Sequence, residues 1–236
     1  MTTFNILVAY TTDCVDWQQQ ELLPIETMSK EDLHSNIYES IDEMNGAFRN
    51  SSIDLEGKIV AIEAINTYVV NGQSVPMACD QYKQELLQGS QFQQVFELRA
   101  KHKADVIMLV IGDHSTVGDP CGGALPATKK NEAFVVIPHR KLLTEYIPAH
   151  EIAHLFGAKH EQGSDLHTQD DGDTAHGHFT QEWRTIMCYE LKWKTKVIQY
   201  FSNPNVSFKG EPTGTTKANN AARILENAPT IIGLRD

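Results

Sequence analysis

The chain has 236 residues, and 41% of them are hydrophobic, which is enough to bury a core within one domain. No apolar run approaches the length of about 18 residues that a membrane-spanning helix needs, so we expect no membrane partner. The net charge of −11 disfavours nucleic acid as a partner, because phosphates attract basic surfaces. We therefore expect a monomeric globular protein with one domain over residues 1–236.

Periodicity predicts alternating strands and helices, which is typical of an α/β fold with a twisted, mostly parallel sheet. Residues 104–111 form a continuous apolar run, as expected for a central strand buried on both faces. Pro148 fits a helix only in its first turn, so the regular part of the helix expected at 141–156 should begin near Ile147. Strands are predicted at 4–10, 58–70 (ending at an Asn71-Gly72 turn), 104–111 and 132–137, and helices at 30–49, 79–102, 141–156 and 217–227.

The composition and periodicity of the chain change after Gly157. The following residues, 161–180, are polar and rich in Asp, His and Gly, and little periodicity returns before the final helix. We therefore predict two lobes within the single domain, an upper one over about 1–157 and an irregular lower one over about 158–236.

The four cysteines and the N-terminus leave several alternatives open. Their even number permits one or two disulfides, and four buried thiols fit equally well. The opening segment, MTTFNILVAY, lacks a basic region and a cleavage site, so it is not a signal peptide. A mature secreted form, a leaderless exported effector and an intracellular protein all fit, and secretion is our expectation. The cysteines are Cys14, Cys79, Cys121 and Cys188.

Residues 150–160 read HEIAHLFGAKH and predict a catalytic zinc site. His150 and His154 are four residues apart, so both imidazoles project from one face of a helix. Gly157 can end that helix in a left-handed conformation and let His160 turn back to the same metal. Three imidazoles leave zinc an open position, and Glu151 is suited to act as the general base for its water.

These residues resemble the metzincin zinc signature, H-E-x-x-H-x-x-G-x-x-H. The sequence TIMCY at 185–189 is similar to the Met-turn of that family, in which Met187 would form a hydrophobic floor beneath the zinc. Residues 200–225 resemble the C-terminal region of bacterial reprolysin-like and peptidyl-Asp metallopeptidases. The resemblance implies a zinc-dependent endopeptidase with a five-stranded sheet, an antiparallel edge strand, long helices and a zinc helix.

The same resemblance extends to residues around the metal. The segment DPCGGAL at 119–125 is similar to the family's edge strand, along which a peptide substrate would lie antiparallel. Tyr189 occupies a position at which some relatives have a tyrosine that ligates zinc or stabilises the transition state. The alternative is that Tyr189 simply packs against its neighbours. Glu161 follows the third histidine, where reprolysin-like enzymes usually have Asp. The implied substrate-binding residues are Gly122, Gly123, Ala124 and Leu125.

Two further features each allow two interpretations. Lys192 or Lys194, after the Met-turn, would attract an acidic side chain next to the cleaved bond, or both are solvated surface lysines. The aspartates at 165, 170, 171 and 173 would hold Ca²⁺, or they belong to a solvated loop; the absence of EF-hand spacing favours the loop. His167, His176 and His178 could be mistaken for further metal ligands, but the stretch His176-Gly177-His178 resembles a family pattern that leads to the Met-turn, and we interpret it as structural.

Two other functions compete with peptide hydrolysis. One is a non-proteolytic zinc-bound fold or a toxin-like effector with a single protein target, and the other is a hydrolase of non-protein amides. The intact Glu151 argues against a catalytically inert protein, and the expected edge strand favours a peptide substrate.

Overall fold

The protein is described by a computed structural model over residues 1–15, 28–66, 69–70, 73–74, 78–88, 92–112, 121–122, 126–162, 172–189 and 195–235. Its helices are α1 (Lys30–Asn50), α2 (Cys79–Gln88), α3 (Gln93–His102), α4 (Ile147–Leu155) and α5 (Asn220–Ile232). The longer strands are β1 (Thr2–Thr11), β2 (Leu55–Ile65), β5 (Val106–Ile111) and β7 (Phe134–Pro138). The two-residue strands are β3 (Val69–Val70), β4 (Gln73–Ser74), β6 (Cys121–Gly122), β8 (Trp183–Arg184), β9 (Lys196–Val197), β10 (Ser207–Phe208) and β11 (Glu211–Pro212).

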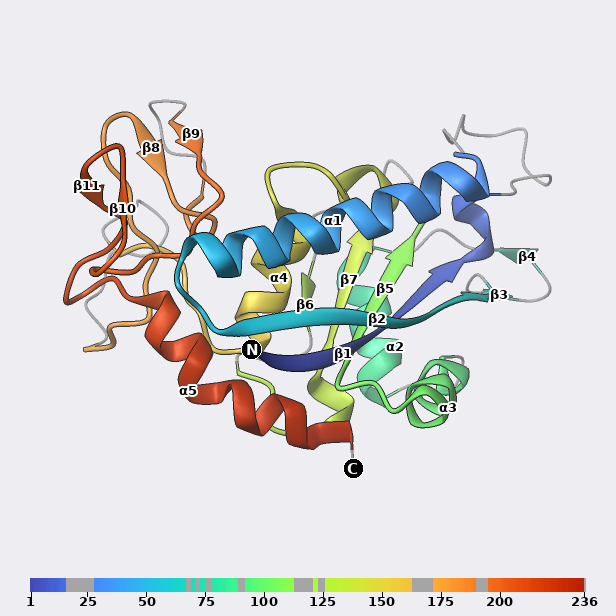
Figure 1. Cartoon of the computed structure of the whole chain (residues 1–236). Coiled ribbons are helices and arrows are strands. Elements are labelled where there is room, and N and C mark those ends of the chain that lie inside the picture. Colours follow the sequence, from blue (N-terminus) through green and yellow to red (C-terminus); the bar gives the residue numbers. More distant parts are fainter. Residues whose placement is uncertain are drawn as a thin grey trace.

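The main sheet has the strand order β2-β1-β5-β7-β6 (Figure 1). The first four of these strands run parallel, and β6 pairs antiparallel with β7 at one edge. Parallel neighbours need crossover connections, which α1 and the pair α2 and α3 supply. The predicted α/β class with a mostly parallel sheet is confirmed.

Both faces of the sheet are buried, because alternate residues of each strand enter opposite cores. In β1, Phe4, Ile6 and Val8 face the first core, where α1, α4 and α5 pack. Leu7 and Ala9 face the second core, which α2 and α3 cover. The continuous apolar run of β5 divides in the same way, so the strand is buried along its whole length as predicted.

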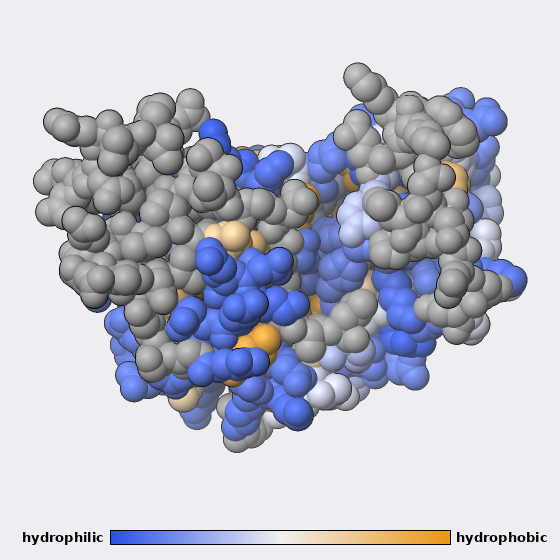
Figure 2. Space-filling model, turned by 180° about the vertical axis from the view of Figure 1, so that it is seen from behind, coloured by the Kyte–Doolittle hydropathy of each residue, from blue (hydrophilic) through white to orange (hydrophobic). Residues whose placement is uncertain are grey.

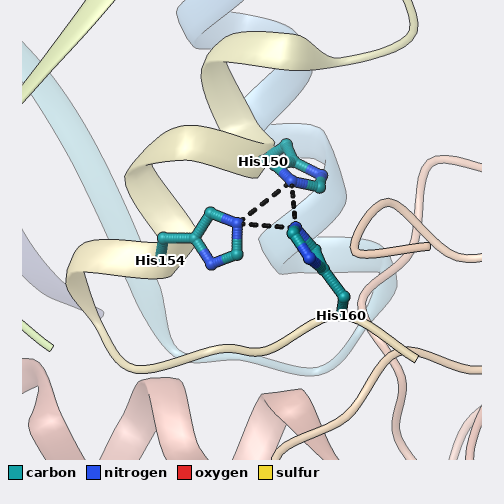
Figure 3. Close-up of side chains that lie close together, drawn as sticks. All are labelled: His150, His154 and His160. Atoms are coloured by element: carbon teal, nitrogen blue, oxygen red, sulfur yellow. Dashed lines mark hydrogen bonds between the residues drawn. The ribbon is translucent and has the colours of Figure 1, made fainter. Parts of the chain in front are cut away.

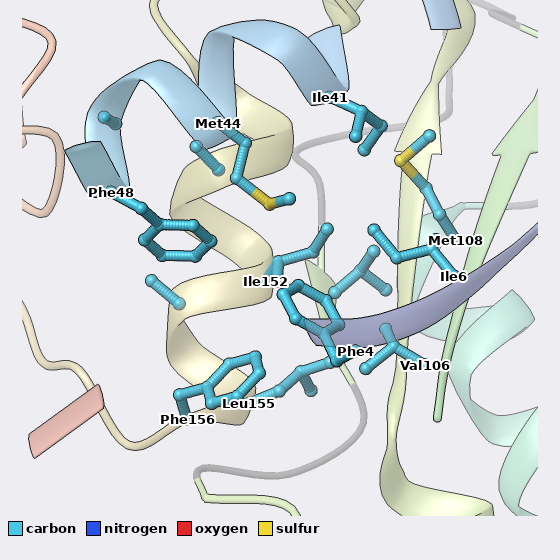
Figure 4. Packing of buried hydrophobic residues seen from close by; sticks show 14 of the residues in the cluster. Phe4, Ile6, Ile41, Met44, Phe48, Val106, Met108, Ile152, Leu155 and Phe156 are labelled. Atoms are coloured by element: carbon cyan, nitrogen blue, oxygen red, sulfur yellow. The ribbon is translucent and has the colours of Figure 1, made fainter. Parts of the chain in front are cut away.

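The first core holds α4 firmly between α1 and the sheet. Figure 4 shows Ile152 and Leu155 of α4 directed toward side chains of α1, β1 and β5. Phe156 lies edge-on against Phe4, with ring centroids 5.2 Å apart. These contacts fix one face of α4 and leave its opposite face for polar groups.

Three predicted elements differ from the structure. The strand expected at 58–70 corresponds to β2, which pairs with β1 from Leu55 to Ile65. Val69 and Val70 form the separate strand β3, which pairs antiparallel with β4. Residues 71–72, where a turn was expected, lie outside the described residues. The helix expected at 79–102 corresponds to the two helices α2 and α3, and residues 89–91 between them lie outside the described residues.

The final helix also begins later and ends later than the predicted 217–227. Residues 215–218 form a hydrogen-bonded turn, and the Asn219 side chain caps α5 by accepting a hydrogen bond from the Ala222 amide at 3.1 Å. The helix continues past Pro229 because Ile231 on its inner face is fully buried in the first core.

Three of the four cysteines are buried thiols in the structure, Cys14, Cys79 and Cys188. Their sulfurs lie near backbone carbonyls, that of Cys188 at 3.3 Å from the oxygen of His178. The possibility of one or two disulfides within the chain is therefore wrong. Burial raises the pKa of the Cys14 and Cys188 thiols above the ordinary range, which keeps them protonated.

On the face in Figure 2 the coloured residues are mostly hydrophilic, and apolar side chains appear there singly. Within the described ranges, no helix has the length and apolar character to cross a bilayer.

Candidate metal centre

Helix α4 brings the first two predicted ligands together. His150 and His154 lie one turn apart on the helix face opposite Ile152, which is fully buried. Pro148 occupies the first turn, as predicted, where its missing N–H costs nothing. The apolar face thus anchors the helix, and the histidine face points into a cleft.

The third predicted ligand approaches because the chain leaves the helix after Leu155 and turns at Gly157. That residue has a φ of +86°, in the left-handed region, and a Cβ there would lie 2.6 Å from Nδ2 of Asn227. Both the backbone conformation and the close approach of α5 therefore require glycine. The reversed chain then places His160 opposite α4.

The Nε2 atoms of the three histidines converge (Figure 3). They form a triangle with edges of 3.0 Å between His150 and His160, 3.1 Å between His150 and His154, and 2.9 Å between His154 and His160. Two rings come from α4 and the third from the loop that follows it. The sequence prediction of these three residues as one cluster agrees with this geometry.

Hydrogen bonds on the far side of two rings fix their tautomers. Nδ1 of His150 donates to the carbonyl of Ile186, and Nδ1 of His154 donates to the carbonyl of Ala158, each at 2.8 Å. A neutral ring with a proton on Nδ1 presents a lone pair at Nε2. Burial lowers the pKa of His150, the Ile186 carbonyl opposes that shift, and the charge of Arg184 adds to it.

This donor set fits zinc. Three imidazole nitrogens about 3 Å apart leave room for an ion at the usual Zn–N distance of about 2.0–2.1 Å, and the adjoining cleft leaves space for a further ligand. Backbone carbonyls that hold the distal ring nitrogens are the outer-shell partners that such ligands ordinarily have. The arrangement matches a catalytic site better than a closed structural one.

The predicted Met-turn lies beneath α4. The amide of Cys188 donates to the carbonyl of Thr185 at 3.0 Å, which closes the turn, and Met187 is fully buried within it. Gly177 packs against this turn so closely that a Cβ would lie 2.7 Å from the Cys188 sulfur. Its neighbours His176 and His178 are thereby held against the turn.

His176 supports the third ligand, in line with its predicted structural role. Its Nδ1 donates to the carbonyl of His160 at 2.8 Å, and its Nε2 lies 3.0 Å from the side-chain nitrogen of Gln162. The amide of Lys159 donates to the carbonyl of Ala175 at 2.8 Å. The segment that carries the third ligand is therefore fixed from both of its ends.

Tyr189 and Glu161 close one side of the centre. The Tyr189 ring lies 4.0 Å from the His160 ring, measured between centroids, and the residue is 38% exposed. Glu161 is fully buried, and its Oε2 accepts a hydrogen bond from the Tyr189 amide at 3.1 Å. The sequence comparison of Glu161 with Asp in relatives did not reveal this contact, which only the folded Met-turn creates.

A cleft of about 350 Å³ opens beside the histidines. Glu151 lies in its wall next to His150 and is 8% exposed, as a group that works in a largely dry site would be. Sequence reasoning missed two charged residues in the same wall, Glu145 and Arg184, which come together only in the tertiary structure.

The remaining predicted groups are only partly described. Gly122 lies in β6 at the sheet edge, next to α4, whereas Gly123, Ala124 and Leu125 lie outside the described residues. So do Lys192, Lys194, His167 and the aspartates at 165, 170 and 171. Asp173 is described, and its carboxylate contacts Lys159 at 2.8 Å and Arg223 at 2.9 Å. Those two cations already occupy the carboxylate that a calcium site would need.

Comparisons with known proteins identify metalloendopeptidases as relatives of this chain. The peptidyl-Asp metalloendopeptidase of Xanthomonas campestris pv. campestris is 27% identical over 199 residues, covering 83% of this chain and 45% of the relative. The enzyme of the same name from Stenotrophomonas maltophilia strain R551-3 is 27% identical over 208 residues, covering 85% and 47%. The chain thus spans about half the length of the curated relatives it matches.

A solved structure described as a chaperone–substrate complex has a TM-score of 0.70 at 15% identity, covering 99% of this chain and 36% of that chain. At this identity the likeness concerns the fold alone. The model of the Reprolysin_5 family, described as metallo-peptidase family M12, matches residues 2–202, which include all three histidines, Glu151 and Met187. The chain therefore belongs to metallopeptidase family M12.

Proposed function

We propose that the chain is a zinc-dependent endopeptidase with one catalytic domain over residues 1–236, composed of an upper and a lower lobe. The observation that carries the proposal is the convergence of three imidazole lone pairs in a cleft whose wall also contains a buried glutamate. Zinc, when bound, supplies Lewis acidity that lowers the pKa of water and polarises a carbonyl.

Glu151 is the proposed general base. It removes a proton from the attacking water and delivers it to the leaving amine, so both transfers use one carboxylate. Its place in α4 directly after His150 supports this role, because the helix fixes it beside the first ligand. Tyr189 is the proposed partner of the developing oxyanion, a role supported by the 4.0 Å separation of its ring from that of His160.

The proposed substrate is a protein or peptide in an extended conformation. Strand β6 supports this, since it ends the sheet and lies against α4, so it can pair with an added strand through Gly122 and the following residues. The relatives are named peptidyl-Asp metalloendopeptidases, and we propose cleavage before Asp for this chain as well. Secretion and a monomeric state stay predictions.

Cleavage of casein and of a peptide library by the wild type and by Glu151→Gln tests the proposal, with zinc measured in both proteins. We expect zinc at one equivalent in each and a loss of cleavage by about 10²-fold or more in the variant. Glu182→Gln, which changes an exposed glutamate, is the matched control and should cleave like the wild type. Equal cleavage by Glu151→Gln, or zinc missing from both proteins, would contradict the mechanism.

A further inference from the structure

Arg184 is the buried cation in the wall of the metal cleft. It belongs to β8, three residues before Met187, and its side chain is 4% exposed. The described cleft wall also contains the apolar side chains of Ile147 and Ile186, which stand with Arg184 beside His150. A guanidinium so little exposed has lost most of its hydration and needs hydrogen-bond acceptors from its surroundings.

The structure gives Arg184 fewer acceptors than it has donors. One terminal nitrogen donates to the carbonyl of Cys188 at 3.2 Å, and the other donates to Oε2 of Glu145 at 2.9 Å. Among the described residues, the buried Nε finds no hydrogen-bond partner. A guanidinium carries five N–H donors in a planar fork, so the part of it that includes Nε can still receive a carboxylate.

Glu145 neutralises Arg184 only in part. Its side chain is 52% exposed, so water screens its charge, whereas the guanidinium is buried. Glu145 has a φ of +45° and the following Tyr146 a φ of +62°, both in the left-handed region that disfavours non-glycine residues. Such consecutive outliers concentrate at functional sites, and here they occur in the turn that presents Glu145 to the cleft just before α4.

We propose that Arg184 is the specificity-determining residue of this cleft and binds the carboxylate of an acidic substrate side chain adjacent to the cleaved bond. This inference rests on the proposed function. Apolar walls, one buried cation with an N–H donor that no described residue satisfies and the nearby metal centre together fit a short acidic side chain of an extended peptide. Arg184, unlike Lys192 and Lys194, lies among the described residues, and it takes the role that one interpretation of the sequence assigned to those lysines.

A purely structural role for Arg184 makes a different prediction. The residue joins the Met-turn, through Cys188, to the turn before α4, through Glu145. If it served only that purpose, its substitution would lower the cleavage of all peptides alike. A recognition role instead changes the preference between peptides, so the ratio of two substrates separates the two roles.

The experiment uses two peptides that differ only in Asp or Asn next to the scissile bond, with the cut located by mass spectrometry. For the wild type, we expect kcat/KM to favour Asp by on the order of 10- to 100-fold, the value of a hydrogen-bonded charge pair. Arg184→Gln should bring the ratio near one, and Arg184→Lys should restore part of it because the charge returns without the planar fork.

Binding provides a second readout that needs no turnover. With Glu151→Gln as the background, calorimetry should show the Asp peptide binding more tightly than the Asn peptide, and the added Arg184→Gln should remove the difference. An Asp preference that survives Arg184→Gln in either measurement overturns the inference.

Glu145→Gln keeps the experiment decisive even if the arginine variants fail to fold. The amide still accepts a hydrogen bond from Arg184 but no longer competes for its charge, so the Asp preference should rise several-fold. Glu182→Gln is again the control. An unchanged or reduced preference in Glu145→Gln, or a wild type that cleaves both peptides equally, contradicts the inference. A zinc-loaded wild type that cleaves neither peptide nor casein contradicts the proposed function instead.

Discussion

Nδ1 of His150 donates a hydrogen bond of 2.8 Å to the carbonyl of Ile186, which joins the metal helix directly to the Met-turn. The bond that fixes the tautomer of His150 also fixes α4 against the Met-turn. The metal centre and the packing of α4 against the Met-turn should therefore be coupled, so that a change in either affects the other.

Removal of the metal should lower stability, because an ion that binds only the folded state stabilises it by mass action. At a free zinc concentration 100 times the Kd, the contribution is about 2.7 kcal/mol. For a chain of this size we expect a Tm decrease of about 5–10 °C on chelation. Scanning calorimetry should show recovery with Zn²⁺ but not with Ca²⁺, and His154→Ala should abolish the zinc-dependent shift; a full shift in that variant would rule out the site.

Gly177→Ala should disturb the Met-turn. The added Cβ would lie 2.7 Å from the sulfur of Cys188 and 3.0 Å from the Met187 carbonyl group, so the turn must move. We expect a loss of about 1–3 kcal/mol in the free energy of unfolding and weaker zinc retention. Gly233→Ala is the control, because no atom lies within 4 Å of a Cβ there; equal losses in both variants would show that the close approach at Gly177 is unimportant.

Asp173 should contribute stability that depends on pH. Burial by itself raises its pKa, but the bonds from Lys159, the amides of Ala175 and Thr174, and the charge of Arg223 together lower it to about 2. Because the folded pKa lies below the unfolded one, near 3.9, the contribution is complete above that value and is lost as the pH falls toward 2.

Asp173→Asn should therefore cost roughly 1–2 kcal/mol at pH 7 and progressively less between about pH 4 and pH 2. Urea unfolding at a series of pH values measures this difference. Asp42→Asn is the control, since the Asp42 side chain is 83% exposed and lies 3.7 Å from Arg49. A pH-independent cost in Asp173→Asn would show that its ion pairs are not the source of the stability.

Ile152→Ala should test whether the apolar face of α4 positions its histidines. The side chain is fully buried between α1 and the sheet, so its truncation should cost about 2–5 kcal/mol. Ile152→Val removes one methylene and should cost only about 0.5–1.5 kcal/mol. If packing positions the ligands, zinc affinity should fall in the same order; an unchanged affinity in a destabilised Ile152→Ala protein would contradict that link.

The centre was predictable from sequence because its geometry is local. The spacing of His150 and His154 requires only a helix, and Gly157 requires only a left-handed turn, so the ligands follow from short-range rules. Glu145 and Arg184, by contrast, are 39 residues apart and meet only through tertiary packing. No periodicity or spacing in the sequence connects them.

The fold likewise has elements that local sequence signals predict and elements whose bounds depend on tertiary contacts. The central strand at 104–111 was predictable because a continuous apolar run has one common explanation, burial on both faces. The extent of α5 was not, since its start depends on the cap at Asn219 and its end on the burial of Ile231 in a distant core. Hydrophobic periodicity predicts that such a helix exists, but its contacts with neighbouring elements determine where it ends.

Helix α5 also lies beyond residue 202, where the match to the family model ends. Asn227 of this helix donates to the carbonyl of Phe156 at 2.9 Å, and Asn220 pairs with both backbone groups of Lys159 at 3.1 and 3.2 Å. The chain between the second and third ligands is therefore held by residues far outside the matched region. An expression fragment cut at residue 202 would encode every ligand and still lack the helix that keeps His160 in place.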